Sequence, residues 1–200
     1  MNAQMSVGLS AIALRKDLVT AYVGRATALA KSGQSARAAA DIKTAEALKP
    51  DDSATLTDIA SVYLALRRYD LALSYLDRAV ALDPKDPRAF NDRCWTRAVW
   101  GRDLDAALAD CARSLGMMQG DTYSYVSRAL VYLKQGKPAL AVDDCDAAVK
   151  IDPKDADAFY LRGRAKLAAG DGKGGDADIA AAKALDAGIA DEYAQYGSVP

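Results

Sequence analysis

Apolar residues recur along this chain at intervals of three and four, the spacing that places them on one face of a helix. The pattern also repeats at a longer interval. The stretch from Ala79 to Cys94 (AVALDPKDPRAFNDRC) returns, with substitutions, 69 residues later at 148–163 (AVKIDPKDADAFYLRG). Because 69 is 34 plus 35, the offset fits two copies of a unit of about 34 residues, the length of a two-helix solenoid repeat. The pattern therefore predicts an array of helix pairs.

Five copies align when the Pro of Leu-Asp-Pro is set at position 32, which is Pro in the first, second and fourth units. The units are 19–52, 53–86, 87–121, 122–155 and 156–189, and the third carries one extra residue near Gly101-Arg102-Asp103, which moves its later positions along by one. Positions 8, 20 and 27 hold only small residues in all five units: Ala26, Ala60, Cys94, Ala129 and Gly163; Ala38, Ala72, Ala107, Ala141 and Gly175; Ala45, Ala79, Ser114, Ala148 and Ala182. Small side chains allow two helices to approach closely. We therefore expect a first helix to contact a second through these positions.

Turn residues mark where the helices end. Position 15, between the two helices of a unit, is glycine in four units, and a glycine there tolerates the positive φ that ends a helix. Arg67 occupies this position in the second unit. Asp86 and Asp155 are suited to cap the helices that follow them, and Pro87 suits a first helical position.

Together these columns resemble the tetratricopeptide repeat (TPR) family over about residues 19–189. The resemblance implies an all-α fold, a right-handed α-solenoid of antiparallel helix pairs that forms a TPR superhelix, in one domain spanning 1–200. Residues 1–18 are expected to form a half-repeat or capping helix, and 190–200 a short C-terminal cap and tail. The chain departs from the family pattern at position 11, where Arg97 and Lys166 replace an aromatic residue.

Two further columns change together. Position 7 is Arg and position 23 is Asp in four units, whereas the second unit has Ile59 and Tyr75 instead. We expect a partly buried Arg–Asp contact between the two helices of each of the four units, replaced by an apolar contact in the second.

Composition narrows the function classes. The 26 basic and 27 acidic residues balance, and no basic block stands out, so nucleic-acid binding is not expected. No apolar run reaches the ~20 residues of a membrane span. Histidine, the commonest general base and metal ligand, is absent. We expect no enzyme activity, no cofactor and no metal, and reject an isolated hydrolase or metalloenzyme for want of a catalytic constellation.

The three cysteines occupy packing columns and are interpreted first as buried thiols. A Cys94–Cys111 disulfide is the alternative, because positions 8 and 24 face each other. Unpaired cysteines favour a cytoplasmic location. A periplasmic location is the alternative if an export signal lies outside this chain.

In the resembled family, positions 2, 5, 9, 12 and 13 of the first helices line a concave groove that binds peptides. Here the C-terminal units offer an aromatic and apolar set with charged margins: Arg88, Asn91, Asp92, Trp95, Val99, Tyr123, Val126, Leu130, Lys134, Tyr160 and Arg164. Such residues are favoured at protein interfaces. Trp95 is interpreted as an anchor for the partner, with packing between repeats as the alternative.

These observations predict a non-catalytic protein-interaction scaffold or adaptor that binds a peptide segment of a protein partner in its groove. The alternative is a recognition module excised from a larger enzyme or a secretion or assembly machine. The family's clamp for acidic chaperone tails is not expected, because no three consecutive units supply its Lys, Arg and Asn residues.

Overall fold

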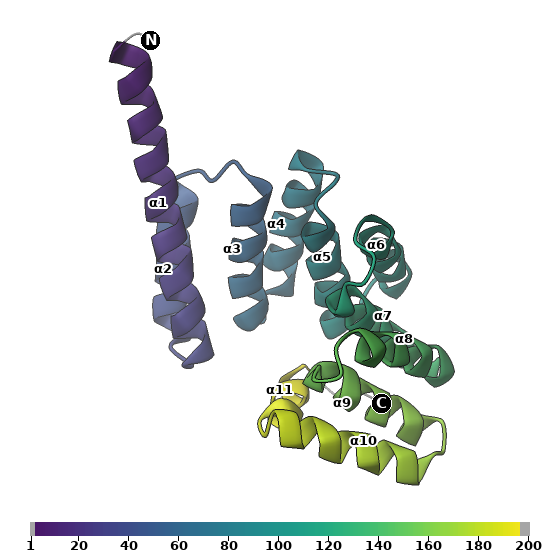
Figure 1. Cartoon of the computed structure of the whole chain (residues 1–200). Coiled ribbons are helices and arrows are strands. Elements are labelled where there is room, and N and C mark those ends of the chain that lie inside the picture. Colours follow the sequence, from purple (N-terminus) through teal and green to yellow (C-terminus); the bar gives the residue numbers. More distant parts are fainter. Residues whose placement is uncertain (1–2, 197–200) are drawn as a thin grey trace. The chain divides into compact units, whose positions relative to one another are not determined.

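The computed structural model describes the backbone of residues 3–196, and the side chains of Leu14 and of 17–196. These residues form eleven helices and no strand. The helices are α1 (Ala3–Lys31), α2 (Ser35–Ala47), α3 (Ser53–Ala65), α4 (Tyr69–Leu82), α5 (Pro87–Trp100), α6 (Leu104–Met117), α7 (Thr122–Lys134), α8 (Pro138–Ile151), α9 (Ala156–Ala168), α10 (Gly172–Leu185) and α11 (Ile189–Gln195). The first ten pack as successive antiparallel pairs (Figure 1). The predicted all-α solenoid of helix pairs is confirmed.

The chain divides into two compact units, Met1–Pro84 and Lys85–Pro200. The division falls within the Leu-Asp-Pro-Lys-Asp-Pro junction between the second and third repeats. Each unit has its own helix pairs, α1 to α4 in the first and α5 to α11 in the second. The single domain expected from the repeat pattern stays a prediction.

The two ends differ in how well the sequence predicted them. A half-repeat or capping helix was expected over residues 1–18; in the structure, α1 runs without a break from Ala3 to Lys31. Lys16 stands where three of the five units have Pro, and unlike Pro it keeps the backbone N–H that a continuing helix needs. At the C-terminal end, where a short cap was expected, α11 packs against α9 and α10. The tail at 197–200 lies outside the described residues.

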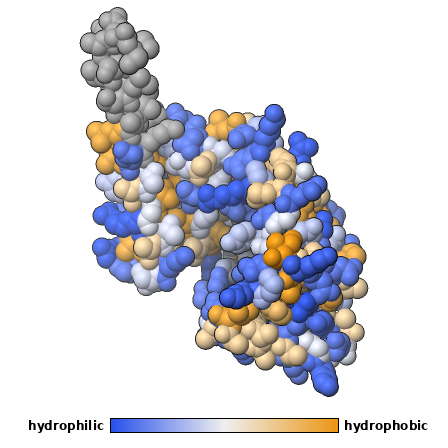
Figure 2. Space-filling model, in the orientation of Figure 1, coloured by the Kyte–Doolittle hydropathy of each residue, from blue (hydrophilic) through white to orange (hydrophobic). Residues whose placement is uncertain are grey.

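The surface is mixed in character. On the face in Figure 2, hydrophilic side chains cover most of the area, and hydrophobic ones form small separate patches. Within the described part of the chain, no helix has both the length and the apolar character that a membrane span requires.

The small-residue columns hold the helix pairs together. All fifteen residues at positions 8, 20 and 27 are buried. The approach is tightest between α9 and α10, where a Cβ built on Gly163 would lie 2.7 Å from Ile179 Cγ1 and 2.8 Å from the carbonyl oxygen of Gly175. Even an alanine methyl would crowd the facing backbone there. The repeat register is thus set by steric fit.

The predicted Arg–Asp contacts are present in all four units. Each guanidinium donates two hydrogen bonds to a carboxylate of the second helix. The pairs Arg25–Asp41, Arg93–Asp110, Arg128–Asp144 and Arg162–Asp178 have Nη2–Oδ1 distances of 2.6, 2.6, 2.6 and 2.8 Å. The four aspartates are buried, between 4% and 7% exposed. The predicted partial burial is therefore confirmed.

Residues at positions 4 and 11 of the repeat also contact these ion pairs. An aromatic ring at position 4, three residues before each arginine, lies beside the guanidinium: Tyr22, Phe90, Tyr125 and Phe159 at 5.5, 5.5, 5.7 and 5.0 Å. The unusual basic residues at position 11 are explained as well. Arg97 donates to Asp110, and Lys166 Nζ lies 2.8 Å from Asp178 Oδ2. Each adds a second cation to a buried carboxylate.

The second repeat, residues 53–86, has an apolar and tyrosine contact in place of the Arg–Asp ion pair. Ile59 is fully buried where the other units have Arg. The Tyr75 ring stacks on Tyr63 at 5.7 Å, and both hydroxyls donate to Glu46 of the preceding unit. Burial, together with this carboxylate, raises the pKa of Tyr75 to about 12. The contact is thus apolar at its centre, as predicted, with a polar bond at its edge.

Helix ends follow the predicted chemistry. Asp86 accepts hydrogen bonds from the first turn of α5, and Asp155 accepts one from Ala158 in α9. Position 15 has a positive φ in every unit, including at Arg67, where φ is +56°. The geometry of this turn is therefore kept even where the residue is not glycine.

The favoured interpretation of the cysteines is wrong for two of the three. Cys94 and Cys111 form a disulfide that links α5 to α6. They stand at facing packing positions, as the alternative interpretation required. Cys145 is free and buried, as expected. The inference of a cytoplasmic location from unpaired cysteines therefore loses its basis.

Arg67→Gly should stabilise the chain. A side chain in the left-handed region costs about 1 kcal/mol relative to glycine, and Arg67 is exposed, so few contacts are lost. The free energy of unfolding, measured by denaturant titration, should rise by about that amount. Gly136→Ala, at the same repeat position with φ of +70°, is the matched control and should destabilise. A loss of stability in Arg67→Gly would contradict the strain argument.

Reduction of the disulfide should destabilise the C-terminal unit. It closes a loop of 17 residues, and a loop of this size constrains the unfolded chain by about 3 kcal/mol. Thermal melts of the same protein with and without reductant should therefore differ. As a check on the pairing, denatured but unreduced protein should expose one titratable thiol, that of Cys145. Three titratable thiols would refute the disulfide.

Candidate functional site

A cavity of about 240 Å³ lies within the unit Lys85–Pro200. It is lined by side chains from α5, α7, α9 and the C-terminal end of α11. The lining residues are Asn91, Asp92 and Trp95, then Tyr123, Val126 and Ser127, then Asp157, Glu192 and Tyr196. No helix supplies more than three of them, so the cavity depends on how these four helices pack together.

Helical spacing explains why these side chains converge. On α5, Trp95 stands four residues after Asn91, and on α7, Val126 stands three residues after Tyr123, so each set shares a helix face. The helices α5, α7 and α9 are the first helices of three successive repeats. The structure packs α5 against α7, and α7 against α9. Their small-residue faces are used against the second helices. The remaining faces adjoin one another and form the cavity wall.

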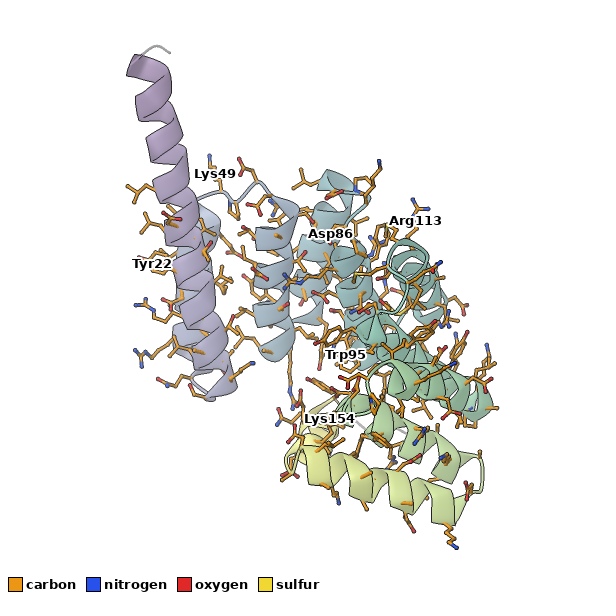
Figure 3. The ribbon with its side chains drawn as sticks, viewed as in Figure 1. Tyr22, Lys49, Asp86, Trp95, Arg113 and Lys154 are labelled. Carbon is orange, nitrogen blue, oxygen red and sulfur yellow. A yellow bond between two sulfur atoms is a disulfide. The ribbon has the colours of Figure 1, made fainter. Side chains whose placement is uncertain are left out.

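The last helix provides the fourth side of the cavity. Tyr193 of α11 is 1% exposed, and its ring lies 4.7 Å from that of Tyr160 and 6.3 Å from that of Trp95. Tyr196 meets Trp95 edge to face at 5.5 Å. The helix cap therefore reaches back across the unit to α5. Trp95, labelled in Figure 3, packs on α11 and also lines the cavity.

The predicted groove residues separate into three groups. Asn91, Asp92, Trp95, Tyr123 and Val126 come together at the cavity. Three others, Val99, Leu130 and Tyr160, do not line the cavity and are only 5%, 0% and 8% exposed, so they are packing residues. Tyr160 is covered in part by Tyr193. The charged residues Arg88, Lys134 and Arg164 do not line the cavity.

Four lining residues were missed. Asp157 occupies position 2 of its unit, the same column as Arg88 and Tyr123, so the repeat register contained the signal. Ser127 lies beside Val126 on α7. Glu192 and Tyr196 belong to α11, outside the repeats, and no column could indicate that they return to α5.

Carboxylates dominate the charge of the cavity. Asp157 Oδ1 accepts a hydrogen bond of 2.8 Å from the Tyr193 hydroxyl, and Glu192 Oε1 accepts one of 2.9 Å from Tyr196. Asp92 Oδ2 lies 3.6 Å from Arg88 Nε. Burial raises the pKa of Asp157, although the Tyr193 hydrogen bond opposes the shift. Of the nine described residues in the lining, none is basic.

Comparison with known proteins decides the family. The model of the tetratricopeptide repeat matches residues 23–87 and 126–193. The chain belongs to the tetratricopeptide repeat family. This is generally a non-catalytic fold of protein-interaction scaffolds, so the coarse prediction of an interaction scaffold is supported.

Relatives of this TPR chain are distant in sequence. A thermophilic TPR protein of Thermus thermophilus is 17% identical, covers 90% of this chain and 98% of its own, and superposes with a TM-score of 0.74. YrrB, described as a TPR protein with an unusual peptide-binding site, is 19% identical over 82% of this chain and 84% of its own, with a TM-score of 0.56. U-box domain-containing protein 70 of Oryza sativa subsp. japonica is 26% identical over 125 residues, 62% of this chain. The match spans only 15% of that rice protein.

Asp157→Asn should stabilise the unit near neutral pH. Because the pKa of Asp157 is higher in the folded chain, the folded state binds the proton more tightly, so stability falls as pH rises through that pKa. An asparagine keeps an acceptor for Tyr193 and carries no charge. The melting temperature of the variant should exceed that of the wild type near pH 7. The difference should vanish below about pH 4, where both side chains are neutral. A difference independent of pH would exclude the ionisation of Asp157 as its cause.

Proposed function

We propose that this TPR chain binds a peptide segment of a partner protein at the cavity between α5, α7, α9 and α11. The observation that carries the proposal is Tyr123, whose large aromatic side chain is 73% exposed at the cavity rim. Exposed aromatic residues beside a concave site are the usual anchors of protein interfaces. Trp95 stands on the neighbouring helix and contributes a second aromatic wall.

The size of the cavity favours one side chain of a peptide over a small-molecule cofactor. Its volume of about 240 Å³ is below the range of ~300–1,000 Å³ typical of sites that enclose small ligands. A partner would place one residue in the cavity and lay its backbone along the rim. YrrB, a similar fold, is described as having a peptide-binding site of its own.

A second function is favoured by the match with the rice U-box protein, in which a segment similar to this chain makes up 15% of a longer protein. The repeats of this chain would then act as the recognition module of a larger enzyme or assembly machine. Both functions use the same cavity, and they differ in whether the bound partner is acted on by another domain.

Tyr123→Ala should abolish most of the binding without affecting folding. Peptides selected from a random library on the intact protein provide the probe, and calorimetry gives their affinities. Truncating an anchor at an interface costs about 2 kcal/mol or more, so Kd should rise at least about 30-fold. The free energy of unfolding should change by less than about 0.5 kcal/mol, as for other exposed positions.

The matched control is Leu185→Ala on α10, which removes an exposed apolar side chain outside the cavity. It should bind the selected peptides like the wild type. Peptides that bind Tyr123→Ala as tightly as the wild type would place the binding site elsewhere and refute the proposal.

A further inference from the structure

We propose that the cavity selects a cationic side chain, a lysine or arginine of the partner peptide. This inference rests on the proposed function, because it names the chemistry of the residue that enters the same site. It differs from recognition of an acidic peptide tail, for which a basic groove would be needed.

Charge complementarity is the first argument. Asp92, Asp157 and Glu192 come from three different helices and meet at one small cavity. The hydrogen bonds that Asp157 and Glu192 accept come from tyrosine hydroxyls, which leave the negative charge in place. The nearby cation, Arg88, is outside the lining, and its side chain is 51% exposed. Even with Arg88 counted, the three carboxylates outnumber this cation, so the cavity keeps a net negative charge.

The aromatic walls are the second argument. Trp95, Tyr123 and Tyr196 line the cavity together, and an aromatic face attracts a cation through its quadrupole. The chain uses the same interaction inside its repeats, where Arg162 lies 5.0 Å from the centre of the Phe159 ring. A cation held between carboxylates and rings gains from both.

A buried acceptor is the third argument. Asn91 lines the cavity, and its Oδ1 atom is buried and accepts no hydrogen bond from the described residues. A buried acceptor without a donor is costly. A turn of the Asn91 amide toward the cavity would bring this oxygen to one N–H donor of an ammonium or guanidinium group, whose three or five donors also bind the carboxylates.

Other side chains fit less well. An apolar residue would strip water from three carboxylates without replacing the lost hydrogen bonds. An acidic residue would add a fourth negative charge at short range, which is repulsive. The cationic residue is therefore the one whose binding offsets the desolvation of the site.

Peptide analogues test the charge directly. Peptides selected on the intact protein, and dependent on Tyr123, should contain a lysine or arginine. Replacing that lysine with norleucine, which keeps the straight chain and removes the ammonium group, should weaken binding at least about tenfold. Replacement with glutamate should abolish it. Selected peptides that depend on Tyr123 but bind equally well with norleucine would refute this inference and leave the proposed function standing.

Variants of the protein locate the charge that is responsible. Glu192→Gln keeps an acceptor for Tyr196, and Asp92→Asn keeps the shape of Asp92. Each should weaken the lysine peptide about fivefold and leave the norleucine peptide unchanged. Asp143→Asn, an exposed residue of α8 outside the cavity, changes the net charge equally and should have no effect. An equal effect of Asp143→Asn would mean general attraction to an acidic protein.

Spermidine, a free polyamine, separates the peptide from a small cationic ligand. It should compete with the lysine peptide only weakly, because it lacks the backbone that lies along the rim near Tyr123. Spermidine that binds as tightly as the peptide would overturn the assignment to a peptide side chain. If no selected peptide loses affinity in Tyr123→Ala, the proposed function itself is refuted.

Discussion

The structure depends on how closely the two helices of each repeat can approach. At positions 8, 20 and 27 a small residue is buried in every unit, and between Gly163 and Gly175 not even a methyl group fits without a shift. A larger side chain at this seam would separate the backbones and lose the dispersion contacts of the whole pair. This contact between small residues also orients the first helix of each repeat, because the face that packs on the second helix is not available to a partner protein. The cavity lies where it does because the opposite faces of α5, α7 and α9 remain available.

The Arg–Asp pairs also join the two helices of a repeat, through polar contacts. Burying an aspartate is costly unless its charge is matched, and each of the four receives two hydrogen bonds from a guanidinium that an aromatic ring flanks. The second repeat, residues 53–86, lacks the ring, the arginine and the aspartate, and has Leu56, Ile59 and Tyr75 at those three positions. The three residues change together because they form one contact. Losing the arginine alone would leave a buried aspartate without its cation, and losing the ring alone would leave an empty space.

Sequence predicted those parts of the structure that repeat. The helix pairs, the aspartate caps and the ion pairs follow from columns in which several units agree. Features that occur once were harder. Nothing at Lys16 distinguishes a helix stop from a continuing helix, so the length of α1 was missed. Cys94 and Cys111 face each other by register, but a thiol packs there as well as a disulfide does. The return of α11 to α5 depends on contacts among Trp95, Tyr160 and Tyr193, which are far apart in sequence.

That return changes the character of the site. The repeat register alone indicates an open groove with apolar and aromatic walls, but Tyr193 occupies part of it and Val99, Leu130 and Tyr160 are buried. What remains accessible is smaller and more acidic, because α11 brings Glu192 to a wall that already contains Asp92 and Asp157. The repeats therefore supply the scaffold, whereas the polarity of the site comes from one residue outside the repeats and from positions at which the units differ. Selectivity in a repeat protein must arise at such positions, since identical units present identical surfaces.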